Sequence, residues 1–255
     1  MSIARIAIVT GAARGIGEAV ALRLANDGLD VAVTDVSASA ESLNAVAEKI
    51  RKTGRRAVAV TGDVSKESDV KAVIDKVVDS LGGVDVMVAN AGIVMNKPAI
   101  ETTLEEYNRV MSINATGIFL SFKYAALQMI KQGRGGRIIG ASSLAGKTGM
   151  TNLSAYSASK FAVRGLTQTC ALEWARYNIT VNSYCPGIIY TPMLTESKKV
   201  EDDKDVPPIE AVRLQKSTPG AQPSVIGNLV SFLAQKDNNF VSGQSINING
   251  GIYFD

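Results

Sequence analysis

Histidine is absent from the 255 residues of this chain, and cysteine occurs only twice. Without histidine there can be no Ser-His-Asp triad, no Cys-His pair and no histidine-ligated zinc site, and we predict no metal site. Two cysteines form at most one bridge, which excludes a disulfide-rich scaffold. Cys170 and Cys185 both lie in apolar segments, a placement that favours buried free thiols.

Long runs of one charge and long apolar runs are also missing. The chain has 27 Lys and Arg against 24 Asp and Glu, and no extended basic run is interleaved with aromatic residues, so nucleic acid is not an expected partner. The apolar stretch within residues 1–10 is too short for a signal peptide, and no later segment reaches about 18 uncharged apolar residues. We therefore predict a cytoplasmic protein with no membrane partner.

The pattern that is present alternates short β-branched runs with longer segments of helical period, which is typical of a parallel sheet covered by helices on both faces. The expected strands are 6–9, 30–34, 57–61, 84–89, 137–141, 179–184 and 244–249, and the expected helices are 16–27, 41–52, 68–81, 104–131, 154–177 and 224–234. No repeat or linker divides the chain. We predict one Rossmann-type, doubly wound α/β domain of about seven strands over residues 1–255.

One segment, 192–215, differs from the rest because it is polar and highly charged and contains the pair Pro207-Pro208. Its simplest interpretation is a solvated surface loop. Because it follows a late strand, we also expect it to serve as a lid over a substrate.

A glycine-rich turn, Thr10-Gly-Ala-Ala-Arg-Gly-Ile-Gly17, follows the first expected strand and leads into a helix. Such a turn allows close approach of the backbone to a pyrophosphate, and the helix N-terminus offers free amides to the anion. The glycines alone are equally consistent with a turn that binds nothing. Asp35, 18 residues after Gly17 at the end of the second strand, adds a carboxylate where a dinucleotide presents its adenosine ribose.

A second group of polar residues follows the fifth strand. Ser143 lies 13 residues before Tyr156, and Tyr156 and Lys160 are four apart, so they share one face of a helix. A ketone that accepts hydride needs a proton donor beside its oxygen and a second donor to orient it. An ammonium about 4 Å from the phenol would lower its pKa by about three units at an effective dielectric near 20.

Taken together, these residues resemble the short-chain dehydrogenases and reductases. The resemblance covers nearly the whole chain, through Asn90-Ala-Gly92, Asn114, Ser143, Tyr156, Lys160, Pro186-Gly187, Gly243-Gln-Ser245 and Asn249-Gly-Gly251. It implies that Ser143 donates to the carbonyl oxygen and that Tyr156 is the acid or base. It also implies that Lys160 holds the nicotinamide ribose and that Asn114 supports a water-linked proton relay.

The resemblance further implies a dinucleotide site and a homotetramer formed through the 104–131 and 154–177 helices. Asp63 and Val64 are expected to flank the adenine. The full set of expected cofactor contacts is Gly11, Arg14, Gly15, Ile16, Gly17, Asp35, Asp63, Val64, Asn90, Gly92, Tyr156, Lys160, Pro186, Gly187, Ile189 and Thr191. Arg14 is suited to the 2′-phosphate of NADP, but Asp35 would repel that phosphate, so we predict NAD as the cofactor.

Within the family, segments 159–169, 182–187, 191–193 and 250–255 look like those of acetoin (diacetyl) reductases and 2,3-butanediol dehydrogenases. That subgroup often has a polar residue after the catalytic serine, whereas this chain has Leu144. The expected substrate pocket consists of Ser143, Leu144, Met150, Tyr156 and Gly187, which favours a more apolar secondary alcohol or ketone.

Two other functions remain consistent with the sequence. One is a 3-oxoacyl thioester reductase that uses NADPH. The other is a non-catalytic dinucleotide-sensing or scaffold protein, which would have no need of the intact Ser143, Tyr156 and Lys160.

Overall fold

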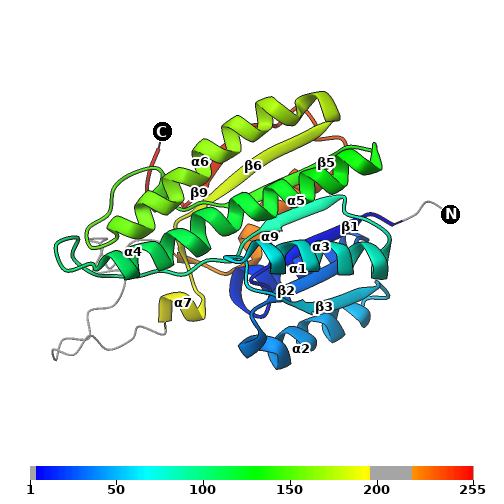
Figure 1. Ribbon diagram of the computed structural model, residues 1–255, viewed down its shortest axis with the longest axis horizontal. Helices are drawn as coiled ribbons and strands as arrows, with labels where there is room; N and C mark the ends of the chain where they lie inside the picture. Colours follow the sequence, from blue (N-terminus) through cyan, green and yellow to red (C-terminus); the bar gives the residue numbers. More distant parts are fainter. Residues whose placement is uncertain (1–3, 196–219, 255) are drawn as a thin grey trace.

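The computed structural model describes residues 4–195 and 220–254. A parallel sheet of seven strands in the order β3-β2-β1-β4-β5-β6-β9 forms its centre (Figure 1). The strands are β1 Ile6–Thr10, β2 Asp30–Asp35, β3 Ala57–Thr61, β4 Val86–Ala89, β5 Gly136–Ala141, β6 Ile179–Pro186 and β9 Ser245–Ile248. A separate pair joins β7, Ile188–Ile189, to β8, Gly220–Ala221. The predicted doubly wound α/β class is confirmed.

Helices cover both faces of the sheet. Helices α1 (Gly15–Asn26), α2 (Ala40–Arg51) and α9 (Ser224–Ala234) pack on one face, and α3 (Glu67–Leu81), α5 (Gly117–Gln132) and α6 (Ser154–Trp174) pack on the other. Alternate strand residues supply the two cores, because successive side chains of a strand point to opposite faces. In β1, Ala7 and Val9 belong to the first core, whereas Ile6 and Ile8 belong to the second.

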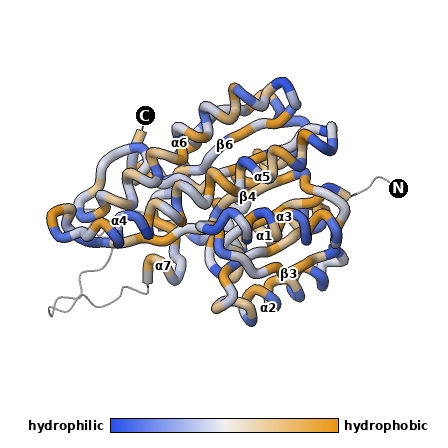
Figure 2. Tube along the Cα trace, viewed as in Figure 1, coloured by the Kyte–Doolittle hydropathy of each residue, from blue (hydrophilic) through white to orange (hydrophobic). Residues whose placement is uncertain are grey.

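Hydropathy along the chain follows this arrangement (Figure 2). The amphipathic helix α2 alternates hydrophobic and hydrophilic residues, and it buries Leu43, Val46, Ala47 and Ile50 against the sheet. The helical stretch Leu104–Gln132 is long and apolar enough to cross a membrane by length and composition, but more than half of its most apolar window is buried. Its α5 portion lies between α3 and α6 and serves as a core helix.

The structure differs from the prediction in the 104–131 helix. The chain forms α4 (Leu104–Met111), a π-helical turn (Ser112–Thr116) and then α5. Likewise the 154–177 helix ends as a 3₁₀ turn, Ala175–Tyr177, and the strand expected at 84 begins at Val86. The remaining elements lie within about two residues of their expected bounds, which is the usual uncertainty of element ends.

At the end of the sheet opposite to the glycine turn, where β4 begins, a buried carboxylate links three segments of the chain. Asp85, 7% exposed, accepts the Ile6 backbone N–H at 2.8 Å through Oδ2. Arg134 donates to both of its oxygens, from Nε at 2.7 Å and from Nη2 at 3.2 Å. Removal of this carboxylate would leave the Ile6 amide and the guanidinium without their acceptor.

We expect Asp85→Ala to lower the free energy of unfolding by at least about 2 kcal/mol, because hydrogen bonds to a charged group are worth about 1.5–3 kcal/mol and a buried amide loses its partner. The control is Glu48→Ala. Glu48 pairs with Arg51 on the exposed surface of α2, where such pairs contribute about 1 kcal/mol or less. Urea unfolding of both variants measures the difference, and equal losses would contradict the role given to Asp85.

Candidate active site

The glycine turn between β1 and α1 has no room for a side chain at Gly11 or Gly17. Gly11 has a φ of 63°, and a Cβ built on it would lie 2.8 Å from the Ala91 Cα. A Cβ on Gly17 would overlap the carbonyl oxygen of Gly11. Arg14 occupies the N-cap position of α1 and makes no side-chain cap hydrogen bond, so the helix presents its first amides beside a tightly folded turn. This cradle fits the pyrophosphate of a dinucleotide.

The end of β4 holds this turn in place. The Thr10 hydroxyl accepts the backbone N–H groups of Asn90 and Ala91, both at 2.9 Å. Asn90 Nδ2 donates to the carbonyl oxygens of Thr10 at 2.9 Å and Gly11 at 3.1 Å. Its Oδ1 accepts the hydroxyl of Tyr184 at 2.8 Å. The side chain of Asn90 therefore braces the turn on which the expected cofactor would lie.

Two carboxylates lie on the side predicted for the adenosine. Asp35 Oδ2 accepts the Ala13 N–H at 3.1 Å, and its Oδ1 accepts the Val36 N–H at 2.9 Å, so β2 is tied to the glycine turn. Asp63 Oδ1 accepts from the Ser65 hydroxyl at 2.7 Å and from the Ser65 N–H at 3.0 Å. The hydroxyl bond from Ser65 is the main reason that the pKa of Asp63 lies below its usual value.

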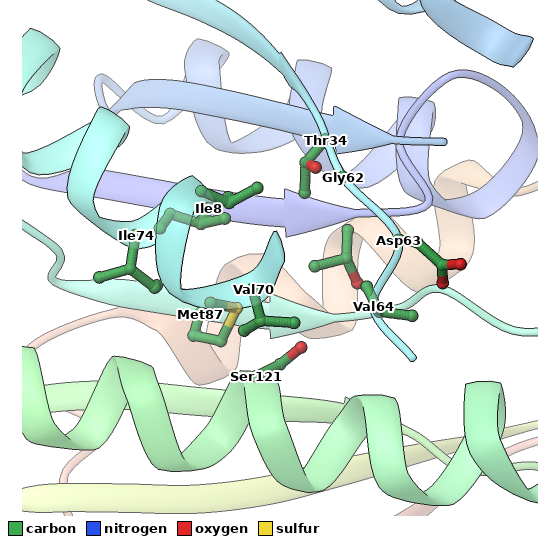
Figure 3. A pocket seen from close by; sticks show the side chains of 11 residues that line it. Ile8, Thr34, Gly62, Asp63, Val64, Val70, Ile74, Met87 and Ser121 are labelled. Carbon is green, nitrogen blue, oxygen red and sulfur yellow. The ribbon is translucent and has the colours of Figure 1, made fainter. Parts of the chain in front are cut away.

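A small cavity lies beneath the turn that carries Asp63 and Val64 (Figure 3). Most of its walls are apolar, including Ile8, Val70 and Met87, and the Asp63 carboxylate points away from it. The Thr34 hydroxyl at its edge is buried and has no hydrogen-bond partner among the described residues. This cavity is thus part of the α3–α5 core below the predicted adenine position.

The predicted chemical residues converge at the end of β5. Ser143 lies two residues after the end of this strand, and its Oγ accepts the Ala145 N–H at 3.1 Å, which caps a 3₁₀ turn over Leu144–Gly146. From the first turns of α6, Lys160 reaches back to donate from Nζ to the Ala141 carbonyl at 2.8 Å. The same ammonium lies 5.5 Å from the centre of the Tyr156 ring. Ser143, Tyr156 and Lys160 therefore lie in one cluster.

Burial controls the protonation of this cluster. It raises the pKa of the Tyr156 phenol, and the hydrogen bond with Ser143 opposes only part of that increase. It also lowers the pKa of Lys160 to about 8, against a smaller opposite effect of Cys185. From the sequence, the charge of the lysine alone is expected to lower the tyrosine pKa. In the structure that pKa is raised, because desolvation of the phenolate outweighs the hydrogen bonding that favours it.

Asn114 lies in the π-helical turn and is fully buried. Its Oδ1 accepts the Ile93 N–H at 2.8 Å, and its Nδ2 donates to the Ile93 carbonyl at 2.8 Å and to Ser159 Oγ at 3.1 Å. A Cβ on Gly92 would lie 3.2 Å from Asn114 Oδ1 and 3.4 Å from Lys160 Nζ. The asparagine is thus beside the lysine, and its amide joins the loop after β4 to α6.

The other predicted cofactor residues lie around the same edge. Pro186 ends β6, and a Cβ on Gly187 would lie 2.9 Å from the Asn249 Cα. Ile189 is buried in β7. Thr191 follows, and its Cγ2 would lie 3.4 Å from a Cβ on Gly15, so this segment packs on the glycine turn. Ile16 is half-buried in the first turn of α1.

Leu144 and Met150 occupy the region predicted for the substrate. Leu144 is buried directly after Ser143, and Met150 is half-buried in the loop that leads into α6. The predicted lid begins with α7, Pro192–Thr195, and the rest of it, from residue 196 on, lies outside the described residues.

A link between two loops near the site was missed by the sequence argument. The Lys97 N–H donates to the Asn152 carbonyl at 2.8 Å, and Lys97 Nζ lies 3.0 Å from both carboxylate oxygens of Glu106 in α4. Asn152 has a φ of 61°, which is uncommon for a residue other than glycine. The loop carrying Met150 is therefore tied to the loop after β4. The only signal of this link in the sequence is Asn152, because asparagine tolerates a positive φ better than most residues.

Comparison with known proteins agrees with this geometry. Residues 5–202 match the family model described as short chain dehydrogenase. A short-chain dehydrogenase/reductase of Armillaria gallica is 46% identical over 256 residues, covering 100% of this chain and 98% of that protein. The (S)-acetoin-forming diacetyl reductase of Staphylococcus epidermidis is 39% identical, covering 99% of this chain and 100% of that protein.

The crystal structure of acetoin dehydrogenase from Salmonella typhimurium superimposes with a TM-score of 0.85 at 34% identity, covering 97% of this chain and 95% of that one. The chain belongs to the short-chain dehydrogenase/reductase family and is an NAD(P)-dependent oxidoreductase that acts on CH–OH groups.

Proposed function

We propose that this enzyme uses NAD(H) to interconvert a small or medium-sized secondary alcohol and its ketone, with an apolar substituent beside the reacting carbon. The observation that carries the proposal is the buried Leu144 directly after Ser143, next to the cluster of Tyr156 and Lys160. An apolar side chain at that position offers no hydrogen bond to a second substrate oxygen, so a hydroxyl or carbonyl buried there would lose its water without compensation.

In the ketone-reducing direction, Ser143 and Tyr156 bind the carbonyl oxygen. When bound, the nicotinamide supplies the hydride that the carbonyl carbon accepts. Tyr156 gives its phenolic proton to the oxygen as negative charge develops there, and Ser143 stabilises that charge by hydrogen bonding. Because burial raises the pKa of Tyr156, the phenol is protonated at neutral pH and suited to act as the acid.

Lys160 has two tasks in this mechanism. Its ammonium, fixed by the Ala141 carbonyl, lies beside the Tyr156 ring and stabilises the phenolate left after proton transfer. The same group is placed to hold the nicotinamide ribose. In the alcohol-oxidising direction the steps reverse, and the phenolate takes the alcohol proton.

A homotetramer is a further part of the proposal. The outer surfaces of the two helices predicted for the interface carry large exposed apolar side chains, which are Phe119 and Leu127 on α5 and Phe161 and Leu172 on α6. Exposed apolar residues gathered on helix faces are typical of protein–protein contacts.

Tyr156→Phe should abolish turnover while the affinity for dinucleotide stays within a few-fold, because only the proton donor is removed and the ring still packs. Lys160→Ala should lower both turnover and dinucleotide affinity, since one ammonium serves both. Steady-state kinetics with a parallel dinucleotide titration measures the two effects. Activity above about a tenth of the wild-type value in Tyr156→Phe would exclude that residue as the acid.

Leu144→Gln should shift the ratio of kcat/KM for diacetyl over an apolar methyl ketone by about tenfold towards diacetyl, the factor that one added hydrogen bond of about 1.4 kcal/mol supplies. Leu144→Met keeps the apolar character and the volume and is the control. A panel of ketones and alcohols, followed by the absorbance of reduced nicotinamide, gives the ratios. It should include an acetoacetyl thioester with NADPH, and preference for that substrate would contradict the proposal.

The wild-type enzyme should prefer NAD over NADP by at least about tenfold in kcat/KM, since a 2′-phosphate near Asp35 would bring like charges together at a cost of roughly 4 kcal/mol for about 4 Å at an effective dielectric near 20. Asp35→Ser should narrow or reverse the ratio and make NADP use depend on Arg14. Glu41→Gln removes the same charge from the exposed first turn of α2 and is the control. A wild-type preference for NADPH would show that this interpretation of Asp35 is wrong.

A further inference from the structure

Tyr184 is a buried tyrosine whose hydroxyl forms a hydrogen bond two strands away from its own strand. It belongs to β6 and is 1% exposed. Within the sheet, β5 separates β6 from β4. The hydroxyl nevertheless donates to Oδ1 of Asn90, just beyond β4, at 2.8 Å. The side chain therefore spans β5, where its register partner is the small residue Ala141.

The Tyr184 hydroxyl helps to hold the Asn90 amide in one orientation. The two ends of an amide side chain have nearly the same shape but opposite hydrogen-bonding character, so the neighbouring groups decide the orientation. The carbonyl oxygens of Thr10 and Gly11 only accept, so Nδ2 faces them. Oδ1 then faces the Tyr184 hydroxyl, whose donated hydrogen bond holds the amide in this orientation.

This orientation matters because the amide touches the glycine turn at its tightest place. A Cβ on Gly17 would lie 2.7 Å from Asn90 Nδ2 and would also overlap the Gly11 carbonyl. The Gly11 carbonyl and the beginning of α1 are thus packed against the same amide. A reversed amide would place its oxygen against two carbonyl oxygens and push the turn away from β4.

Tyr184 is also connected to the chemical end of the site. Its backbone carbonyl accepts the Ser142 N–H at 2.9 Å, directly before Ser143. Pro186 and Gly187 follow two and three residues later in the same strand and loop. One residue therefore contacts, through its backbone, the strand end that carries Ser143 and, through its side chain, the brace of the glycine turn.

We propose that Tyr184 is a positioning residue for the dinucleotide, which fixes the Asn90 amide and through it the shape of the glycine turn between β1 and α1. The inference rests on the dinucleotide-dependent function proposed above. It assigns a purpose to a phenol that takes no part in proton transfer.

Tyr184→Phe tests the inference because it removes the hydroxyl and keeps the ring. Titration with NADH, followed by nicotinamide fluorescence, should show the dissociation constant rising at least fivefold, while kcat at saturating dinucleotide and the KM for ketone stay within about twofold. The control is Thr167→Val, which removes another fully buried hydroxyl bond, to the Val163 carbonyl in α6. It should lower the melting temperature without changing NADH affinity.

A double-mutant cycle separates positioning from general damage. In an Asn90→Ala background, Tyr184→Phe should have no further effect on the NADH dissociation constant. Asn90→Asp provides a second route if Tyr184→Phe fails to fold, since the carboxylate still accepts from Tyr184 but cannot donate to Thr10 and Gly11, and it should weaken NADH binding at least fivefold.

Two results would overturn the inference: NADH affinity within twofold of wild type in Tyr184→Phe, or an equal loss of affinity with and without the Asn90 amide. Where Tyr184→Phe cannot be obtained, unchanged affinity in Asn90→Asp has the same consequence. A wild-type enzyme that binds no NADH would instead contradict the proposed function, so the two failures are distinguishable.

Discussion

Where β1 and β4 end side by side, the Thr10 hydroxyl and the Asn90 amide exchange hydrogen bonds with each other's backbone. From this seam the chain winds outward in both directions, through β2 and β3 on one side and through β5, β6 and β9 on the other. A crevice opens at such a reversal, because the helices on either side leave in opposite directions. The glycine turn, the carboxylate of Asp35 and the loop that carries Ser143 all border it, so their relative positions depend on this seam.

Burial of Tyr156 and Lys160 away from water is the main cause of their pKa shifts. An exposed phenol and an exposed ammonium would each hold their ordinary proton affinity, but in this site burial raises the pKa of the phenol and lowers that of the lysine, so that both groups favour their neutral forms. The phenol therefore keeps its proton at neutral pH, whereas the lysine gives up its own near pH 8. The Ala141 carbonyl holds the ammonium at a fixed place in this arrangement.

The sequence was sufficient for the fold class and for the family, because those features depend on local periodicity and on residues at fixed spacing. The π-helical turn could not be predicted, since it depends on Asn114 bonding to Ile93, 21 residues away. The predicted direction of the Tyr156 pKa shift was wrong for a related reason: the spacing of Tyr156 and Lys160 indicates a nearby charge, whereas the desolvation that raises the pKa depends on the folded surroundings. The hydrogen bond from Lys97 to Asn152 could not be predicted either, because it joins two loops that no sequence motif relates.

The π-helical turn determines which side of α5 faces the core relative to α4. In a regular α-helix, residues eight positions apart differ in direction by about 80°. One extra residue accommodated in residues 112–116 reduces the difference between Val110 and Ile118 to about 20°, and both are buried. The turn therefore works as a phase correction: it lets α4 and α5 present a common apolar side to the core while Asn114, between them, faces the site. If residues 112–116 were all wound into a regular α-helix instead, the whole of α5 would rotate by about 100° relative to α4 and the two requirements would separate.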